Sequence, residues 1–204
     1  SLKWFRDNFC GAEKDTAALM DVDEYYLMDK EAETVPIGAE RLLYLPYLMG
    51  ERTPHLDPDA RGVFFGLSAM HTKKHMLRAV MEGVAYSLRD CVEVFREMGI
   101  NVSDMMACGG GGTSPLWRSM LADLYGCEVK TPASKEGPAL GAALLASVGA
   151  GIYGSVPEAV KAVVRTDKVC QPDSSRMERY DEFYSLYREI YPALKDSFSR
   201  LATL

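Results

Sequence analysis

Apolar residues recur every three or four positions between residues 72 and 98. This spacing places them along one face of an α-helix, which a helix buries against the rest of a protein. The face consists of Met76, Leu77, Val80, Val84, Leu88, Cys91, Val92 and Phe95. Gly99 follows, and glycine readily adopts the left-handed backbone conformation that ends many helices. The pattern therefore predicts one long amphipathic helix over 72–98.

Weaker versions of the same pattern predict further helices. They are expected at residues 1–9, 16–30, 115–125, from 137 onwards, 155–164 and from 176 onwards. Ser114 before Pro115 is a typical helix start, because the hydroxyl can cap the helix and the ring presets φ. Ser155 and Glu158 have the spacing of a capping box. Pro192 lies inside the last segment and is expected to kink or restart that helix.

An aromatic row at helical spacing runs along this last segment. Its members are Tyr180, Phe183, Tyr184, Tyr187, Ile190, Tyr191 and Leu194. Because the spacing is that of a buried helix face, we interpret the row as core and not as a stacking platform for a ligand.

Short apolar runs between the helices predict strands at residues 42–45, 62–66, 104–108 and 127–130. Strands that alternate with helices are typical of an α/β domain whose sheet is covered on both faces. So few strands would make a small sheet, or one with unpaired edges. The sequence also begins at Ser1 within a helical pattern. Both observations suggest a fragment of a larger fold.

Composition narrows the functional classes. The chain has 204 residues, of which 48% are hydrophobic and 25% charged, as in an ordinary folded protein. Its net charge of −6 predicts neither a nucleic acid nor an anionic membrane surface as partner. No apolar run approaches the roughly 20 residues that span a bilayer. Five cysteines, an odd number without C-x-x-C spacing, predict reduced thiols in a cytoplasmic protein.

Four consecutive glycines, Gly109 to Gly112, follow the strand at 104–108 and precede the helix that begins at Pro115. Glycine lets the backbone approach a phosphate closely, and the N-terminus of a following helix favours an anion. The segment is no P-loop, because no Gly-Lys-Ser/Thr follows. It is not G-x-G-x-x-G either. The residues alone leave two readings open, a phosphate-binding turn and a mobile connection. A second glycine turn lies at 137–141, and its glycines are more simply explained by tight helix packing.

Two other groups of polar residues could carry chemistry. The loop at 50–55 holds Glu51, Arg52 and His55, which could contact a substrate or transfer protons. We favour an internally bonded loop in which Arg52 or Arg61 pairs with a carboxylate. His71 and His75 have a zinc-compatible spacing. However, Thr72 stands where H-E-x-x-H has its glutamate, and two lysines follow, so we expect two solvated histidines at a helix start.

Taken together and in order, several segments resemble the FGGY carbohydrate kinases. They are residues 45–62, 62–82, 109–123 and 137–143. Residues 62–82 resemble the C-terminal signature of the family, and the Gly-Glu-Arg-Thr-Pro-His loop resembles its xylulokinase branch. Gluconate kinases carry a similar Gly-Glu-Arg loop.

The resemblance implies an α/β fold of the ribonuclease H-like, actin-like ATPase class. Residues 1–204 would form the C-terminal, nucleotide-side domain, incomplete at its N-terminal end. The sugar-binding domain and the aspartate that acts as base would lie outside the chain, which then holds neither a catalytic nor a metal-ligating residue. ATP with Mg²⁺ would bind in the cleft between the two domains. The implied nucleotide-binding residues are Gly109, Gly110, Gly111, Ser114 and Lys3.

The implied activity is transfer of the γ-phosphoryl group of ATP to a small sugar, most simply D-xylulose to give D-xylulose 5-phosphate. Some family members are dimers, so a homodimer is compatible with the resemblance. The alternatives are a kinase of the same family for gluconate, ribulose or glycerol, an actin-like nucleotide-binding module without transfer chemistry, and a structural fragment that binds nothing.

Overall fold

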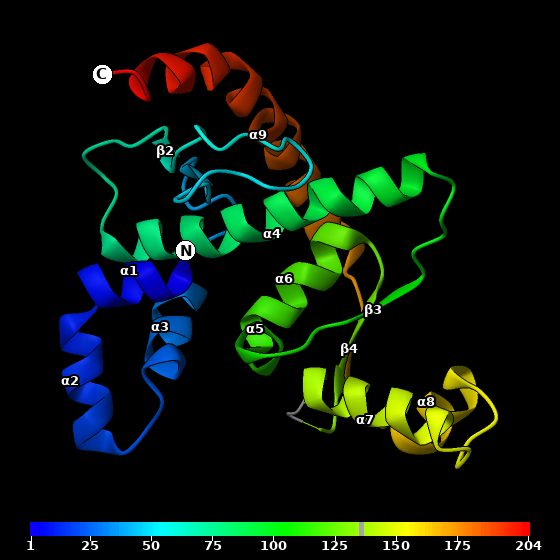
Figure 1. Ribbon diagram of the computed structural model, residues 1–204. Helices are drawn as coiled ribbons and strands as arrows, with labels where there is room; N and C mark the ends of the chain where they lie inside the picture. Colours follow the sequence, from blue (N-terminus) through cyan, green and yellow to red (C-terminus); the bar gives the residue numbers. More distant parts are fainter. Residues whose placement is uncertain (135–136) are drawn as a thin grey trace.

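The computed structural model describes residues 1–134 and 137–204 (Figure 1). The chain begins with three helices, α1 (Leu2–Phe9), α2 (Gly11–Met20) and α3 (Glu24–Glu33). The first was predicted. The single helix expected at 16–30 is wrong, because Asp21 adopts the left-handed conformation with φ 52° and ends α2. Asp23 then starts α3 by accepting a hydrogen bond from the backbone N–H of Tyr25.

Strands β1 (Leu43–Leu45) and β2 (Val63–Phe65) form an antiparallel pair, and α4 (Lys73–Glu97) packs against β1. Helix α4 confirms the prediction for 72–98. Thr72 and His75 form a capping box at its start, and Gly99 follows its end with φ 78°. The helix approaches β1 closely at Gly83, where any Cβ atom would overlap the carbonyl oxygen of Tyr44.

The second sheet contains β3 (Asp104–Met106), β4 (Glu128–Pro132) and β5 (Thr166–Cys170), in the order β3-β4-β5. Strand β4 is parallel to β3 and antiparallel to β5. Strand β5 was not predicted, because its side chains are mostly exposed and carry no apolar run. The small size expected for the sheet is confirmed, and β3 and β5 form its two edges among the described residues.

Helices α5 (Gly110–Thr113) and α6 (Pro115–Tyr125) connect β3 to β4. Between β4 and β5, α7 (Gly137–Gly149) and α8 (Val156–Val163) pack against each other at one end of the molecule (Figure 1). The predicted cap of α8 is present, since the backbone N–H of Glu158 donates to the Ser155 hydroxyl. The Glu158 carboxylate accepts from the N–H of Gly154 and not from that of Ser155.

The last helix, α9 (Ser174–Leu201), continues through Pro192 and does not restart there. Figure 1 shows it bending toward its C-terminal end, in agreement with the kink expected from an interior proline. Asp173 caps its start by accepting hydrogen bonds from two backbone N–H groups.

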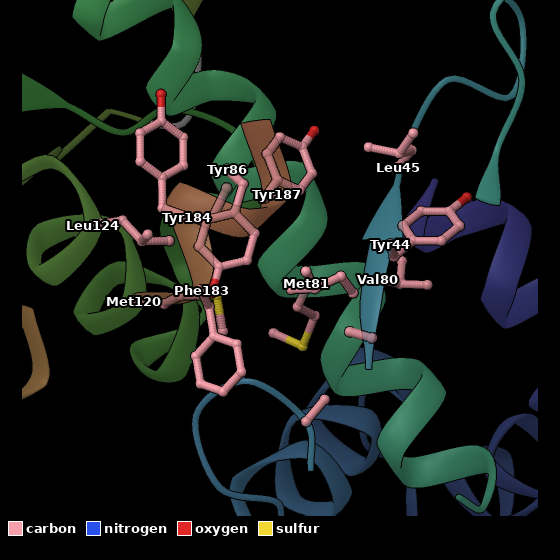
Figure 2. Packing of buried hydrophobic residues seen from close by; sticks show 14 of the residues in the cluster. Tyr44, Leu45, Val80, Met81, Tyr86, Met120, Leu124, Phe183, Tyr184 and Tyr187 are labelled. Atoms are coloured by element: carbon pink, nitrogen blue, oxygen red, sulfur yellow. The ribbon is translucent and has the colours of Figure 1, made fainter. Parts of the chain in front are cut away.

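The aromatic row of α9 forms the centre of the hydrophobic core (Figure 2). Tyr184 and Tyr187 lie beside Tyr86 of α4, with ring centroids 6.0 and 5.2 Å away. Met120 and Leu124 of α6 complete this side of the core. The prediction that the row is core is therefore confirmed.

A buried ion pair lies inside this core. The Arg78 guanidinium bonds the Glu82 carboxylate at 2.7 Å, and both side chains are buried. Arg78 also donates to the hydroxyl of Tyr180 at 2.9 Å, and the backbone N–H of Gly38 donates to Glu82. This cluster joins α4, α9 and the segment before β1.

All five cysteines are free thiols, as predicted. Within residues 1–134 and 137–204, no helix combines the length and the apolar character needed to cross a bilayer.

Candidate functional site

The glycine run forms a short helix, α5, where the sequence left a phosphate-binding turn and a mobile connection as the two open readings. Gly109 begins it with φ 74°, a conformation that side chains rarely adopt. A Cβ atom at Gly112 would overlap the carbonyl oxygen of Ala107 at the end of β3. Gly110 is different, because a Cβ atom there would meet nothing within 4 Å. The backbone thus requires glycine at 109 and 112, whereas Gly110 faces open space.

Ser114 joins this turn to two helices. Its hydroxyl oxygen accepts a hydrogen bond from the backbone N–H of Trp117 at 3.0 Å and so caps α6, as predicted. The same hydroxyl also faces the carboxylate of Asp29 on α3 and acts on its pKa. Burial raises the pKa of Asp29, and the Ser114 hydroxyl opposes that rise.

Arg118, one turn into α6, fastens the turn from the other side. Its side chain is buried, with 7% of its surface exposed. The Nη1 atom donates to the carbonyl oxygens of Gly112 at 2.6 Å and Thr113 at 2.8 Å. The carbonyl oxygens at the end of α5 therefore accept hydrogen bonds from a positively charged side chain.

Two cavities flank the turn. The first, which we call the polar cavity, measures about 540 Å³. Its lining is Asp23, Ala107, Gly109, Gly110, Gly112, Thr113, Arg118, Thr131, Pro132, Ala133, Ser134, Asp167 and Lys168. The second, the aromatic cavity, measures about 460 Å³. Its lining is Leu2, Asp23, Tyr25, Tyr26, Asp29, Gly110, Gly111, Thr113, Ser114, Pro115 and Trp117. Gly110 and Thr113 belong to both.

The structure brings four of the five expected nucleotide-binding residues together. Gly109, Gly110, Gly111 and Ser114 all line one cavity or both. Lys3 is exposed and lies outside both linings, although its neighbour Leu2 lines the aromatic cavity.

Sequence reasoning missed the residues that other elements bring to the turn. Tyr25, Tyr26 and Asp29 come from α3, whose start was not recognised, and Lys168 comes from the unpredicted β5. Arg118 was missed because a helical arginine usually faces solvent. The Asp23 cap was the available signal for α3, since aspartate is a preferred N-cap residue.

The loop at 50–61 is internally bonded, as favoured above, but through other partners. The Glu51 carboxylate accepts from the backbone N–H groups of Thr53 at 2.6 Å and His55 at 2.7 Å. Arg61 donates to the carbonyl oxygens of Pro58 and Ala60. The expected pairing of Arg52 or Arg61 with a carboxylate is absent from the described residues. Backbone amides take the place of the arginine.

The two histidines near the start of α4 are half-buried and hydrogen-bonded, not simply solvated. The Nδ1 atom of His75 accepts from the backbone N–H of Thr72 at 3.0 Å. The Nε2 atom of His71 lies 3.1 Å from the carbonyl oxygen of Glu40. No group of three side chains able to hold a metal ion occurs in the described part of the chain.

Comparison with known proteins identifies the family to which a chain with this site belongs. Residues 1–150 match the family model described as the FGGY family of carbohydrate kinases, C-terminal domain. The chain is 38% identical over 196 residues to the xylulose kinase of Bacillus subtilis, covering 96% of this chain and 37% of that protein. It is 36% identical over 202 residues to the gluconokinase of Bacillus licheniformis, covering 98% and 39%.

A solved structure agrees in shape. The ligand-bound xylulose kinase of Lactobacillus acidophilus superposes with a TM-score of 0.84 at 30% identity, covering 98% of this chain and 39% of that one. The chain thus spans well under half the length of the relatives that it matches.

Proposed function

The chain belongs to the FGGY family of carbohydrate kinases, and on that premise we propose that it forms the nucleotide-binding part of an ATP-dependent sugar kinase. The observation that carries the proposal is the glycine turn with a cavity on either side. One cavity contains cationic and backbone donors, and the other is lined by aromatic rings. A nucleotide has the same two-part chemistry, a polyanionic phosphate chain and a flat base.

We place the phosphates in the polar cavity, beside Gly109 and Gly110. Arg118 and Lys168 supply positive charge there, and the absence of a side chain at Gly110 leaves room for close approach. The adenosine would occupy the aromatic cavity, where Tyr25, Tyr26 and Trp117 offer apolar and stacking surface. Lys3 stays a proposed contact at the rim, because it directly follows Leu2 of α1, which lines this cavity.

Bound ATP would supply the γ-phosphoryl group, and Mg²⁺ would bind chiefly through phosphate oxygens and water, with at most one or two carboxylates such as Asp23 or Asp167. The residues of this chain would bind and orient the nucleotide. Positioning and electrostatic stabilisation provide most of the catalysis in phosphoryl transfer. We place the sugar-binding residues and the base outside these 204 residues.

D-Xylulose is the proposed acceptor, since the relatives named above include xylulose kinases. The similarity to a gluconokinase keeps D-gluconate as the second candidate. A reducing compartment such as the cytoplasm is the expected location, because free thiols are typical of one.

The nucleotide site is tested by Gly110→Val with ADP titrated calorimetrically into the chain. A Cβ atom at residue 110 would meet no other atom within 4 Å, and Gly110 lines both cavities. We expect unchanged thermal stability and at least a tenfold loss of ADP affinity, about 1.4 kcal/mol. Gly141→Ala in α7, also in open space, is the matched control and should bind ADP normally. Equal ADP affinity in wild type and Gly110→Val would contradict the placement.

The acceptor is tested in the complete enzyme by following ADP release with D-xylulose, D-ribulose, L-ribulose, D-gluconate and glycerol. Preference for D-xylulose supports the proposal. Preference for another sugar would leave the kinase assignment standing but contradict D-xylulose as the acceptor. ADP binding without any sugar-dependent turnover would favour a nucleotide-binding module without transfer chemistry.

A further inference from the structure

Arg118 is a buried cation that forms no ion pair with a carboxylate among the described residues. Only 7% of its surface is exposed, and within residues 1–134 and 137–204 no carboxylate pairs with its guanidinium. The other buried arginine of a core helix, Arg78, follows the usual rule and pairs with Glu82 at 2.7 Å. Burying a charge without a partner is costly, so such a residue calls for an explanation.

The hydrogen bonds of Arg118 attach it to the end of α5. Both are donated to carbonyl oxygens there, those of Gly112 at 2.6 Å and Thr113 at 2.8 Å. The C-terminal carbonyls of a helix carry partial negative charge, which a cation stabilises. Helix α5 has only four residues, and three are glycine, which disfavours helix by about 1 kcal/mol each. The turn therefore needs support from outside its own sequence.

Arg118 also lines the polar cavity, whose lining includes Lys168 as a second cation and two carboxylate residues, Asp23 and Asp167. Guanidinium has five N–H donors, and the two carbonyls are both served by Nη1. The carbonyls are neutral, and neither Asp23 nor Asp167 forms an ion pair with Arg118, so its charge remains available to attract an anion.

We propose that Arg118 is a positioning residue for nucleotide binding: it clamps the end of α5, so that the glycine turn holds its shape between the two cavities, and its uncompensated charge favours phosphate in the polar cavity. This inference rests on the proposed nucleotide-binding function. It concerns a residue that acts through the turn, not one that reacts.

The first test compares ADP with adenosine binding in Arg118→Met, Arg118→Lys and the wild type. Methionine keeps the apolar stem without donors or charge, whereas lysine keeps the charge without the forked geometry. We expect Arg118→Met to weaken ADP binding at least about tenfold, as loss of hydrogen bonds to a charged group implies. Adenosine lacks phosphates, so its affinity for Arg118→Met should fall less than about threefold. The ADP affinity of Arg118→Lys should lie between those of Arg118→Met and the wild type.

Arg165→Met is the matched control. Arg165 also donates to two carbonyl oxygens near a helix end, those of Lys161 and Val164, but it is exposed and its side chain lies outside both cavities. Its replacement should leave ADP binding within twofold of the wild type. An Arg118→Met chain that binds ADP like the wild type would overturn the proposal, as would an equal loss for adenosine and ADP.

The second test needs no nucleotide. Amide hydrogen exchange by NMR follows the Gly112 N–H, which bonds the Gly109 carbonyl inside the turn. In Arg118→Met we expect exchange at Gly112 to rise at least about tenfold while amides of β4 stay protected. Unchanged exchange at Gly112 would overturn the clamp. A wild-type chain that binds no ADP would refute the proposed function, and the Gly112 result would still decide whether Arg118 positions the turn.

Discussion

The hydroxyl of Tyr191 lowers the pKa of a neighbouring carboxyl group, that of Asp57. The hydroxyl donates to Asp57 at 2.8 Å, and this bond is the largest of the effects that hold the pKa of Asp57 below its ordinary value of 3.8. In Tyr191→Phe the ring can still stack on His55, whose centroid lies 4.0 Å away, but the donor is gone. We expect the pKa of Asp57 to rise toward 3.8, as measured by carbon NMR titration of the carboxyl group.

The same bond makes stability depend on pH. A carboxylate whose pKa is lower in the folded state contributes stability above its unfolded pKa, and the contribution disappears as pH falls through the folded pKa. Tyr191→Phe should therefore be less stable to urea at pH 7 and differ less from the wild type near pH 3. In an Asp57→Asn background that pH-dependent difference should vanish. A pH-independent loss of stability in both backgrounds would contradict this account.

Glu82 shows the cost of breaking a buried pair. Its carboxylate bonds Arg78 and accepts from the backbone of Gly38. Glu82→Gln keeps the shape but leaves Arg78 uncompensated, so we expect a loss of about 3–5 kcal/mol in the free energy of unfolding. Urea denaturation measures it. Replacing both partners, as in Arg78→Met with Glu82→Leu, should recover much of the loss, whereas a Glu82→Gln loss below about 1 kcal/mol would show that the pair is unimportant.

At the scale of elements, Gly83 sets how closely α4 lies on β1. A Cβ atom would overlap the Tyr44 carbonyl oxygen, so Gly83→Ala must push the helix away from the strand. We expect a net loss of about 1–3 kcal/mol in thermal or urea unfolding, even though alanine favours helix. Gly141→Ala in α7 meets no atom and should be neutral or stabilising by up to about 1 kcal/mol. Equal stability of the two variants would mean that the close approach carries no cost.

Elements with strong local signals were predictable. Helix α6 begins where Ser114 precedes Pro115 and ends at Gly126, which adopts φ 61°. These signals act within one helical turn, so they can be recognised in a linear sequence. Helix α5 and strand β5 lack such signals. Helix α5 forms because Gly112 packs on Ala107 and Arg118 donates to the carbonyls of the turn. Strand β5 forms because β4 offers an edge with which it can pair.

At the scale of the whole molecule, the chain should bind nucleotide without turning it over. We expect no sugar-dependent ADP formation when the 204 residues are incubated with ATP, Mg²⁺ and D-xylulose, because the proposed base and sugar pocket lie outside them. A coupled assay for ADP measures this, with a complete xylulose kinase as the positive control. Turnover that depends on the sugar and disappears in Gly110→Val would refute the assignment of the base to another part of the enzyme.

Four features could be recognised in the linear sequence: the family, the long helix α4, the aromatic core face of α9 and the glycines that line the two cavities. These follow from periodicity, caps and motifs, which depend on neighbouring residues. Three others became visible only in the folded chain. Helix α3 brings Tyr25 and Asp29 to the turn, Lys3 lies outside the cavity linings, and Arg118 donates to backbone carbonyls instead of facing water. Such contacts depend on how elements distant in sequence pack, and that packing is governed by the burial of shared surfaces, which no local pattern encodes.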